Sequence, residues 1–594
     1  MWKSIRQTYD LVGREQRGRW LLLVVLALVV SLLEMVGAVL VYTLLALIVD
    51  PAGDIEIPIL GDLRQQFTTV SERDLLLSVV LVIAIFFLLR GVTKVAATYA
   101  QTRASHNAGA RLSRRLIEGY LRWPYSAHLH RPSAQLIRNG HQAILELVQS
   151  VILPVIKVIA EIALILGMLI VLALIAPGAT ALAVAVIGGA AVLLLIVVQP
   201  RLRRLGAINH RESLESFAAV QQPLQGIRDI KILGREGFFT NVYAGSRQRL
   251  ARARYLHATA VQLPPIVIET ALIGFILLFF TITLMQNDPT QEVLSILGLF
   301  AYVGLRLQPS LKEVVQGLNS LKFAAAPLSD IHEDFRSIQA MGTPDSDPQP
   351  LPMECHLLLE RVSFRYESAA LSALKNVDLT IFAGEQIGIA GPTGGGKTTL
   401  VDVIAGLLQP TEGRVMVDEA DLTDNTRAWQ RSLGLVPQMI FLVDDTLRAN
   451  IALGVPEGQV NNVALDQAVR LAQLDEFVES LPDGLQTRVG ERGVRISGGQ
   501  RQRIAIARAL YQRPSVLIFD EGTSALDNAT ESMLMNAIES LRGEHTIILV
   551  AHRLSTVRSC DRVVFIEGGQ ITGLGTYDEL VRDNERFRAM ALAG

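Results

Sequence analysis

The stretch EQIGIAG at 385–391 runs directly into GPTGGGKT at Gly391–Thr398. A short apolar run that ends in glycines is typical of a buried strand followed by a tight turn. Glycines let successive backbone N–H groups turn inward around phosphate oxygens, Lys397 can reach the β- and γ-phosphates, and the Thr398 hydroxyl can bind Mg²⁺. Thr399 extends the helix whose N-terminus faces the phosphates. The other residues of this predicted nucleotide-binding loop are Pro392, Thr393, Gly394, Gly395 and Gly396.

Two further motifs follow in an order that suits nucleotide chemistry. ISGGQ at 496–500 opens the helical pattern QRQRIAIARAL, and Ser497 with the amides of Gly498, Gly499 and Gln500 suits a γ-phosphate. Alone, this motif is equally typical of a helix cap. VLIFDE at 516–521 carries Asp520 and Glu521 to the end of a strand. Asp520 can hold the Mg²⁺ shell, and Glu521 can orient and polarise the attacking water.

The segments around these motifs alternate between strands and helices. HLLLERVSFRY at 356–366 alternates like an edge-sheet strand, and the runs at 385–391, 516–521 and 545–552 read as buried strands. Such a pattern predicts an α/β P-loop nucleotide-binding domain with a parallel core sheet.

The first half of the chain has a different composition. Half of the 594 residues are hydrophobic and 19% are charged, which is too apolar for a soluble protein of this size. Six apolar stretches are long enough to span a membrane as helices. They lie near 20–49, 75–99, 145–175, 178–199, 259–286 and 292–318.

The charges between these stretches predict the orientation. The segments 101–140 and 200–258 are rich in arginine, whereas the 50–74 loop is mostly acidic. The positive-inside rule therefore places both termini, the two long connections and the nucleotide-binding domain in the cytoplasm. We expect each connection to continue its flanking helices, with tips near 123–125 and 226–237 as candidates for docking onto the nucleotide-binding domain.

Proline divides the chain into its expected domains. Gly342–Met353 holds four prolines, and a segment so short with so many prolines cannot form a helix or the interior of a sheet. The predicted domains are 1–340 with six membrane helices, a linker at 341–353, and the nucleotide-binding domain at 354–594. In the first outer loop, 57–70 reads either as a short amphipathic helix at the membrane surface or as a structured loop.

Several charged residues fall inside the predicted spans, where charge is costly. Glu34 lies in the first span, Arg90 and Lys94 in the second, and Arg306 about midway along the sixth. Lys157 and Glu161 are four residues apart and can pair along one helix face. Lys94 fits a side chain that snorkels to the interface. Arg306, Arg90 and Glu34 are candidates for a substrate cavity.

Taken together, GPTGGGKT, ISGGQ, VLIFDE, SALD and AHRLS resemble the ATP-binding cassette (ABC) family, and the six spans resemble its half-size exporters with the type IV exporter fold. The resemblance implies that Tyr366 stacks on adenine and that Gln438 contacts Mg²⁺. It also implies that Asp527 crosses a dimer interface and that His552 contacts the γ-phosphate. Ile496, Gly395 and Gly522 depart from the usual residues without removing a functional group.

The resemblance also implies an assembly and a cycle. In this family one copy's phosphate loop and the other copy's SGGQ grip each ATP, so the chain is expected to form a homodimer. ATP and Mg²⁺ are the expected cofactors, and Glu521 and His552 the catalytic residues. ATP-driven closure would switch the cavity from inward to outward. The expected location is the bacterial inner membrane, and no nucleic-acid partner is expected.

The substrate is the least constrained feature. The membrane half resembles the PglK-type flippases of lipid-linked oligosaccharides through SLLEMVG, RGVTK and YVGLRLQPS. A lipid-linked substrate with a pyrophosphate would need basic groups in the cavity, which Arg90 and Arg306 could supply. A multidrug or peptide exporter has the same architecture. An ATP-gated channel or regulator is an alternative of another class.

Overall fold

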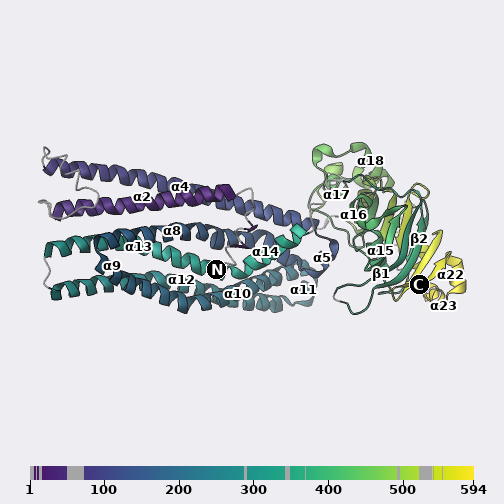
Figure 1. The fold of residues 1–594 in the computed structure, drawn as a ribbon. Coiled ribbons are helices and arrows are strands. Elements are labelled where there is room, and N and C mark those ends of the chain that lie inside the picture. Colours follow the sequence, from purple (N-terminus) through teal and green to yellow (C-terminus); the bar gives the residue numbers. More distant parts are fainter. Residues whose placement is uncertain are drawn as a thin grey trace. The chain divides into compact units, whose positions relative to one another are not determined.

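The computed structural model describes residues 6–7, 10–11, 17–49, 72–286, 290–340, 348–367, 369–490, 496–520, 535, 538–539, 541–551 and 553–593. Contacts divide the chain into two compact units (Figure 1). The first comprises Met1–Trp123 and His128–Thr343, and the second comprises Pro124–Ala127 and Pro344–Gly594. The 57–70 stretch lies outside the described residues.

Long helices build the first unit. Five described segments are long and apolar enough to cross a membrane, namely Gly18–Leu44, Leu76–Arg122, Ser133–Ile175, Pro177–Val198 and Glu236–Ile282. The sixth expected span, 292–318, lies within another long helix. The helices that contain the spans are α2 (Arg17–Val49), α4 (Glu72–Arg122), α8 (Leu153–Ile175), α9 (Pro177–Ala183), α10 (Gly189–Gln225), α12 (Glu236–Gln286) and α13 (Thr290–Phe323).

The two long connections continue the membrane helices, as predicted. Helices α4 and α12 have 51 residues each. At 1.5 Å per residue each is about 76 Å long, more than twice the ~30 Å hydrocarbon core of a bilayer. Short helices, α5 (Tyr125–His130) and α11 (Ile227–Leu233), lie at the two expected tips.

The third span does not begin as the regular helix that its sequence predicts. Between α6 (Ser133–Arg138) and α8, two π-helical turns, Asn139–Ala143 and Val148–Ile152, flank α7 (Ile144–Leu147). Pro154 stands at the start of α8 and has no N–H to donate to the preceding turn. The Ser113 hydroxyl also donates to the carbonyl of Gly140 within the first π turn. The missing N–H of Pro154 and the hydrogen bond from Ser113 both favour a locally widened helix.

A buried carboxylate fixes the end of α4. Asp334, on α14 (Ala325–Ala340), is 2% exposed. It accepts hydrogen bonds from the Tyr120 hydroxyl at 2.5 Å and from the Asn139 amide at 3.2 Å, and it pairs with Arg131. The hydrogen bond from Tyr120 thus ties α14 to the end of α4.

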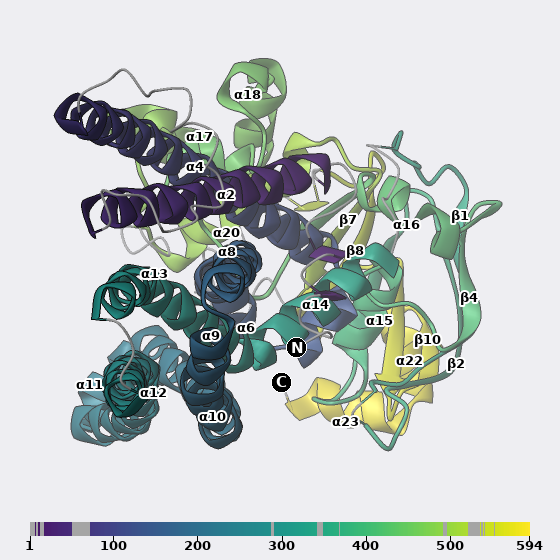
Figure 2. The ribbon, with the colours of Figure 1, turned by 60° about the vertical axis from the view of Figure 1, so that its left-hand side comes forward.

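The second unit contains two β-sheets (Figure 2). Strands β9, β3, β8, β7 and β6 are parallel neighbours, and β10 is antiparallel at the edge next to β9. This parallel core was predicted. The strands are β3 (Gln386–Ala390), β6 (Leu433–Val436), β7 (Val516–Asp520), β8 (Thr546–Val550), β9 (Arg562–Glu567) and β10 (Gln570–Gly575).

The other sheet is antiparallel, in the order β2-β1-β4-β5. Its strands are β1 (His356–Phe364), β2 (Leu374–Phe382), β4 (Glu412–Val417) and β5 (Ala420–Asp421). The prediction of an edge strand at 356–366 is wrong, because β1 pairs with β2 on one side and β4 on the other. Alternation along a strand shows that one face is buried, but not whether its edges are paired.

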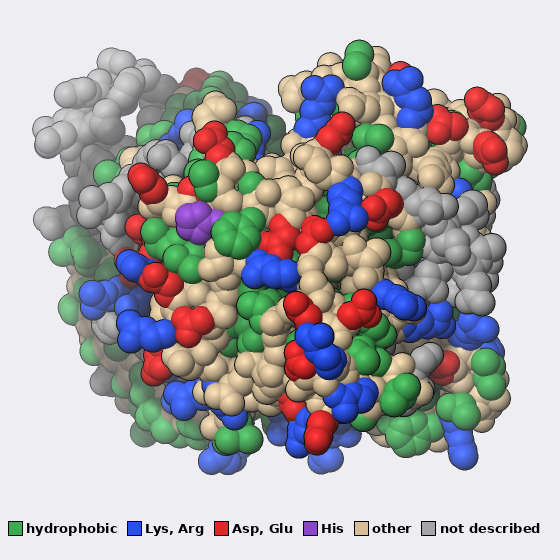
Figure 3. Space-filling model, turned by 90° about the vertical axis from the view of Figure 1, so that its right-hand side faces the viewer, with side chains coloured by type: hydrophobic (Ala, Val, Ile, Leu, Met, Phe, Trp, Pro, Cys, Tyr) green, Lys and Arg blue, Asp and Glu red, His purple; other side chains and the backbone are tan. Residues whose placement is uncertain are grey.

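Helices cover the parallel sheet, and its inner strands β3, β8 and β7 are buried on both faces. All five residues of β3 and of β8 are buried. On the face shown in Figure 3, basic and acidic side chains are interspersed. The helices of this unit are α15 (Lys397–Ile404), α16 (Leu422–Gln430), α17 (Leu447–Ile451), α18 (Asn462–Leu471), α19 (Asp475–Glu479), α20 (Gly498–Tyr511), α22 (Tyr577–Asp583) and α23 (Glu585–Ala593).

Candidate functional site

The predicted phosphate loop joins β3 to α15. Gly394 and Gly396 have φ of 78° and 108°, in the region that favours glycine. A Cβ on Gly391 would lie 2.1 Å from the carbonyl oxygen of Ile566, and one on Gly396 would lie 2.9 Å from that of Ala373. The loop is therefore held close to neighbouring backbone, which is possible only where side chains are absent.

The first three residues of α15 directly follow this loop. Lys397 is 4% exposed, and its Nζ donates to the carbonyls of Gly391 at 2.8 Å and Pro392 at 3.1 Å. Thr398 lies exposed in the first turn of the helix. Thr399 is buried, and its Oγ1 lies 3.2 Å from the hydroxyl of Tyr366. Tyr366, the expected adenine partner, thus lies beside the same helix.

Parallel pairing brings the other expected ligands to the same edge of the sheet. Asp520 is aligned with Val550, and Val550 is aligned with Ile389, one residue before the end of β3. Neighbouring strands are about 4.8 Å apart, so Asp520 lies about 10 Å across the sheet from β3. Gln438 follows the end of β6, the next strand beyond β7. Ligands typically bind at this carboxyl edge of α/β sheets.

The ISGGQ motif forms a complete capping box. The Ser497 hydroxyl accepts from the backbone N–H of Gln500 at 3.3 Å, and the Gln500 side-chain oxygen accepts from the backbone N–H of Ser497 at 2.9 Å. The structural interpretation of SGGQ as a helix cap is correct. The cap leaves Ser497 and Gly498 exposed at the positive end of the 14-residue α20, so a phosphate can still approach.

Three expected site residues, Glu521, Asp527 and His552, lie outside the described residues. One carboxylate at the site was missed. Burial, and then the charge of Asp520, raises the pKa of Asp402 to about 6. Asp402 lies four residues after Thr398 on α15, and this spacing places the two side chains on one helix face. That spacing was the available signal.

The residues of this site fit a nucleoside triphosphate with a bound Mg²⁺ ion. The loop offers backbone N–H groups where a Cβ would collide, and Lys397 supplies a positive charge beside it. The Thr398 hydroxyl, the Asp520 carboxylate and the Gln438 amide are oxygen donors, the kind that Mg²⁺ prefers.

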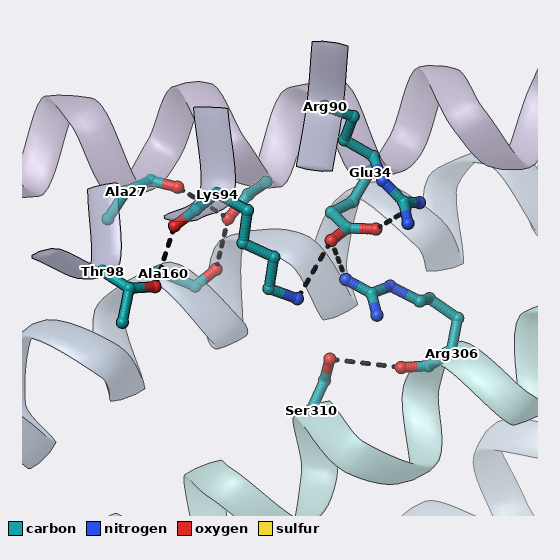
Figure 4. A network of polar contacts seen from close by, with 9 residues as sticks. Ala27, Glu34, Arg90, Lys94, Thr98, Ala160, Arg306 and Ser310 are labelled. Carbon is teal, nitrogen blue, oxygen red and sulfur yellow. Dashed lines mark hydrogen bonds and ion pairs between the residues drawn. The ribbon is translucent and has the colours of Figure 1, made fainter. Parts of the chain in front are cut away.

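A second cluster of polar residues lies within the spans (Figure 4). The carboxylate of Glu34 pairs with Arg90 at 3.0 Å, with Lys94 at 3.3 Å and with Arg306. We call these four residues the intramembrane charge cluster. The structure thus brings together Glu34, Arg90 and Arg306, the three residues expected in a substrate cavity.

Helix geometry explains why these residues meet. Glu34 lies 15 residues from the end of α2, Arg90 lies 18 from the start of α4, and Arg306 lies 16 from the start of α13. At 1.5 Å per residue, the three residues lie about 22, 27 and 24 Å along their helices from the helix ends that are predicted to be outside. Gly37, one turn from Glu34, packs beside Arg90: a Cβ at this position would lie 3.6 Å from a guanidinium nitrogen, an ordinary van der Waals contact.

The partners of the two lysines were not predicted. Lys94 was interpreted as a snorkelling side chain, yet its ammonium reaches inward to Glu34 although its side chain is 51% exposed. Lys157 was expected to pair with Glu161, but it pairs with Glu313 of α13 at 3.4 Å. Sequence spacing identifies neighbours on one helix, whereas these pairs join different helices.

Comparisons with known proteins agree with both halves of the chain. The family model for the ABC transporter transmembrane region matches residues 20–304, and the ABC transporter model matches residues 374–524. The chain is 30% identical over 508 residues to an ATP-dependent lipid A-core flippase of Cupriavidus pinatubonensis, covering 85% of each chain. It is 41% identical over 230 residues to a putative multidrug export ATP-binding/permease protein of Bacillus subtilis, covering 39% of each.

A solved structure has the same fold. A bacterial Atm1-family ABC exporter with ATP bound superimposes with a TM-score of 0.80 and 22% identity, covering 96% of this chain and 98% of that one. With a phosphate loop on an α/β sheet and membrane helices ahead of it, the chain belongs to the ABC transporter family and is an ATP-hydrolysing half-size exporter embedded in a membrane.

Proposed function

We propose that this exporter moves a lipid-linked substrate with a phosphate-bearing headgroup from the cytoplasmic to the outer side of a bacterial inner membrane. The observation that supports this proposal is the intramembrane charge cluster, in which three cations pair with Glu34 within the spans. Charged side chains inside a membrane are costly, and they commonly mark a substrate path. Several relatives, including proteins of Cupriavidus pinatubonensis and Ralstonia nicotianae, are ATP-dependent lipid A-core flippases.

The proposed ATP chemistry assigns a role to each motif. Tyr366 stacks on adenine, and residues 391–399 bind the phosphates. Thr398, Gln438 and Asp520 would hold Mg²⁺, and the bound cation would neutralise charge on the phosphates. Glu521 polarises the attacking water, and His552 contacts the γ-phosphate.

We further propose that the chain works as a homodimer. Ser497–Gln500 of one copy would close over the nucleotide held by the other, and Asp527 would lie at the interface. Closure and release would then drive alternating access through the long helices.

Substituting Arg306 tests the proposed substrate. Arg306→Ala removes one of two guanidiniums from the charge cluster, so we expect flipping of a phosphate-bearing lipid to fall at least tenfold. Flipping is measured in vesicles as ATP-dependent protection of a fluorescent lipid from a membrane-impermeant quencher. The control is Arg115→Ala, an exposed arginine on α4 far from the cluster. Flipping at the parental rate by Arg306→Ala would contradict the proposal.

A multidrug exporter is the second candidate, and the likeness to the Bacillus protein favours it. That likeness covers only 39% of each chain. Transport of uncharged amphipathic drugs at equal rates by the parent and Arg306→Ala would support this candidate.

A further inference from the structure

The intramembrane charge cluster has more positive than negative charge. Arg90, Lys94 and Arg306 contribute +3 and Glu34 contributes −1, which leaves +2. No other described carboxylate pairs with these three cations. Unbalanced charge is costly inside a membrane, so the cluster is electrostatically incomplete without an anion.

The four side chains differ in how far they are covered. Glu34 is 2% exposed, whereas Arg90, Arg306 and Lys94 are 20%, 23% and 51% exposed. The carboxylate therefore lies beneath the cations, and an approaching anion would meet the cations first. Figure 4 shows Arg90 and Lys94 reaching Glu34 from one helix and Arg306 from another.

The cluster also has more donors than acceptors. Two guanidiniums and an ammonium can donate many more hydrogen bonds than one carboxylate can accept. The Nε atoms of Arg90 and Arg306 are buried and have no hydrogen-bond partner among the described residues. A ligand with several acceptor oxygens would accept from the exposed parts of these three side chains, whereas the two Nε atoms are covered by protein.

We infer that Glu34 competes internally with the substrate's anionic headgroup and thereby sets its charge selectivity and its release. The inference rests on the proposed function. In the absence of a headgroup, Glu34 holds the three cations together. When a headgroup with two negative charges binds, it balances the remaining +2, whereas a singly charged headgroup leaves the cluster unbalanced. During release, the carboxylate recaptures the cations as the headgroup leaves.

Variants that change the net charge in steps test this role. Glu34→Gln gives +3, Lys94→Gln gives +1, and the double variant returns to +2. The full-length protein is placed in lipid nanodiscs. Binding of a fluorescent, sugar-capped polyprenyl diphosphate, which carries two negative charges, is compared with that of the matching sugar-capped monophosphate, which carries one because capping removes the second ionisation of the phosphate. We expect Glu34→Gln to lower the diphosphate Kd about tenfold and Lys94→Gln to raise it about tenfold.

The double variant and the release rate separate competition from structural support. If charge is decisive, the double variant should return to within about threefold of the parental Kd. The Glu34→Gln protein should also flip lipid more slowly at saturating lipid, because it releases the headgroup more slowly. The Glu34→Asp protein keeps the negative charge and should retain the parental ratio of diphosphate Kd to monophosphate Kd. A purely structural role predicts no change in this ratio.

The outcomes distinguish this inference from the proposed function. Binding by Glu34→Gln that is unchanged or weaker overturns the role of Glu34 alone, provided that Arg306→Ala still weakens binding. If Arg306→Ala does not weaken binding, or if the parent binds neither probe, the proposed function fails. If Glu34→Gln does not fold, the double variant decides: a diphosphate Kd that is no lower than that of Lys94→Gln would overturn the inference.

Discussion

Asp402 lies at the phosphate loop but has no assigned part in ATP chemistry. It is on the same face of α15 as Thr398, and its pKa is raised to about 6 by burial and by Asp520. In the unfolded chain its pKa is the ordinary 3.8. The folded state therefore holds the proton more tightly, and Asp402 reduces the free energy of unfolding as the pH rises from about 4 to 6.

Replacing this carboxylate should stabilise the protein in a pH-dependent way. We expect Asp402→Asn to melt at a higher temperature than the parent, with a difference that grows between about pH 4 and 6 and is constant above pH 7. Melting of the purified protein at pH 5, 6 and 7.5 checks this. Asp466→Asn, at an exposed position of α18, is the control. A difference that shrinks with rising pH would contradict the assignment.

Single residues were predictable where the chemistry is local. The phosphate loop needs glycines and a lysine within eight consecutive residues, so its geometry follows from the sequence alone. The contacts of Lys94 depend on which helix packs against α4, and spacing along one helix does not contain that information. Glu34, Arg90 and Arg306 could be suspected because charge is rare at mid-span.

At the scale of elements, one close approach positions α10 against the end of α13. A Cβ on Gly206 of α10 would lie 2.3 Å from the carbonyl oxygen of Phe323. Gly189, in the same helix, has nothing within 4 Å of its Cβ position. The two glycines therefore have different roles, although both lie in one continuous helix.

Paired alanine substitutions test this difference. Gly206→Ala should force the helices apart and cost about 1–3 kcal/mol of stability, because a backbone carbonyl cannot move aside as a side chain can. Gly189→Ala should be neutral or stabilise by about 0.5–1 kcal/mol, since alanine is the better helix former. Thermal melting in detergent measures both. Equal effects of the two substitutions would refute the close approach.

Most elements followed from periodicity, and the exceptions have physical causes. The six apolar stretches and the buried strands carry strong patterns. The π turns before α8 do not, because they depend on Pro154 and on the Ser113 contact from another helix. The Asp334 contacts with Tyr120 and Asn139 were likewise missed, since they join residues about 200 positions apart.

At the scale of the whole molecule, the proposed homodimer makes each ATP site from two copies. Chains with Lys397→Ala and chains with Ser497→Arg would each form homodimers without an intact site. When the two are co-expressed, half of the dimers are mixed, and each mixed dimer has one intact site of two.

This arithmetic gives a measurable expectation. The co-expressed mixture should retain about one quarter of the ATP that the same amount of parental protein retains, while each variant alone should retain almost none. Retained nucleotide is measured after rapid removal of free ATP, and mixing the variants after purification is the control. Sites contained within single chains would give no recovery in the mixture.

The excess positive charge beside Glu34 has an electrical consequence. Membrane voltage does work of about 2.3 kcal/mol per elementary charge per 100 mV. With a doubly negative lipid bound, the site is neutral, so voltage does little work on the loaded protein as it reorients. The empty site retains its surplus charge, so a negative interior would favour its return inward. Voltage should therefore accelerate the reset of the pump more than its loaded stroke.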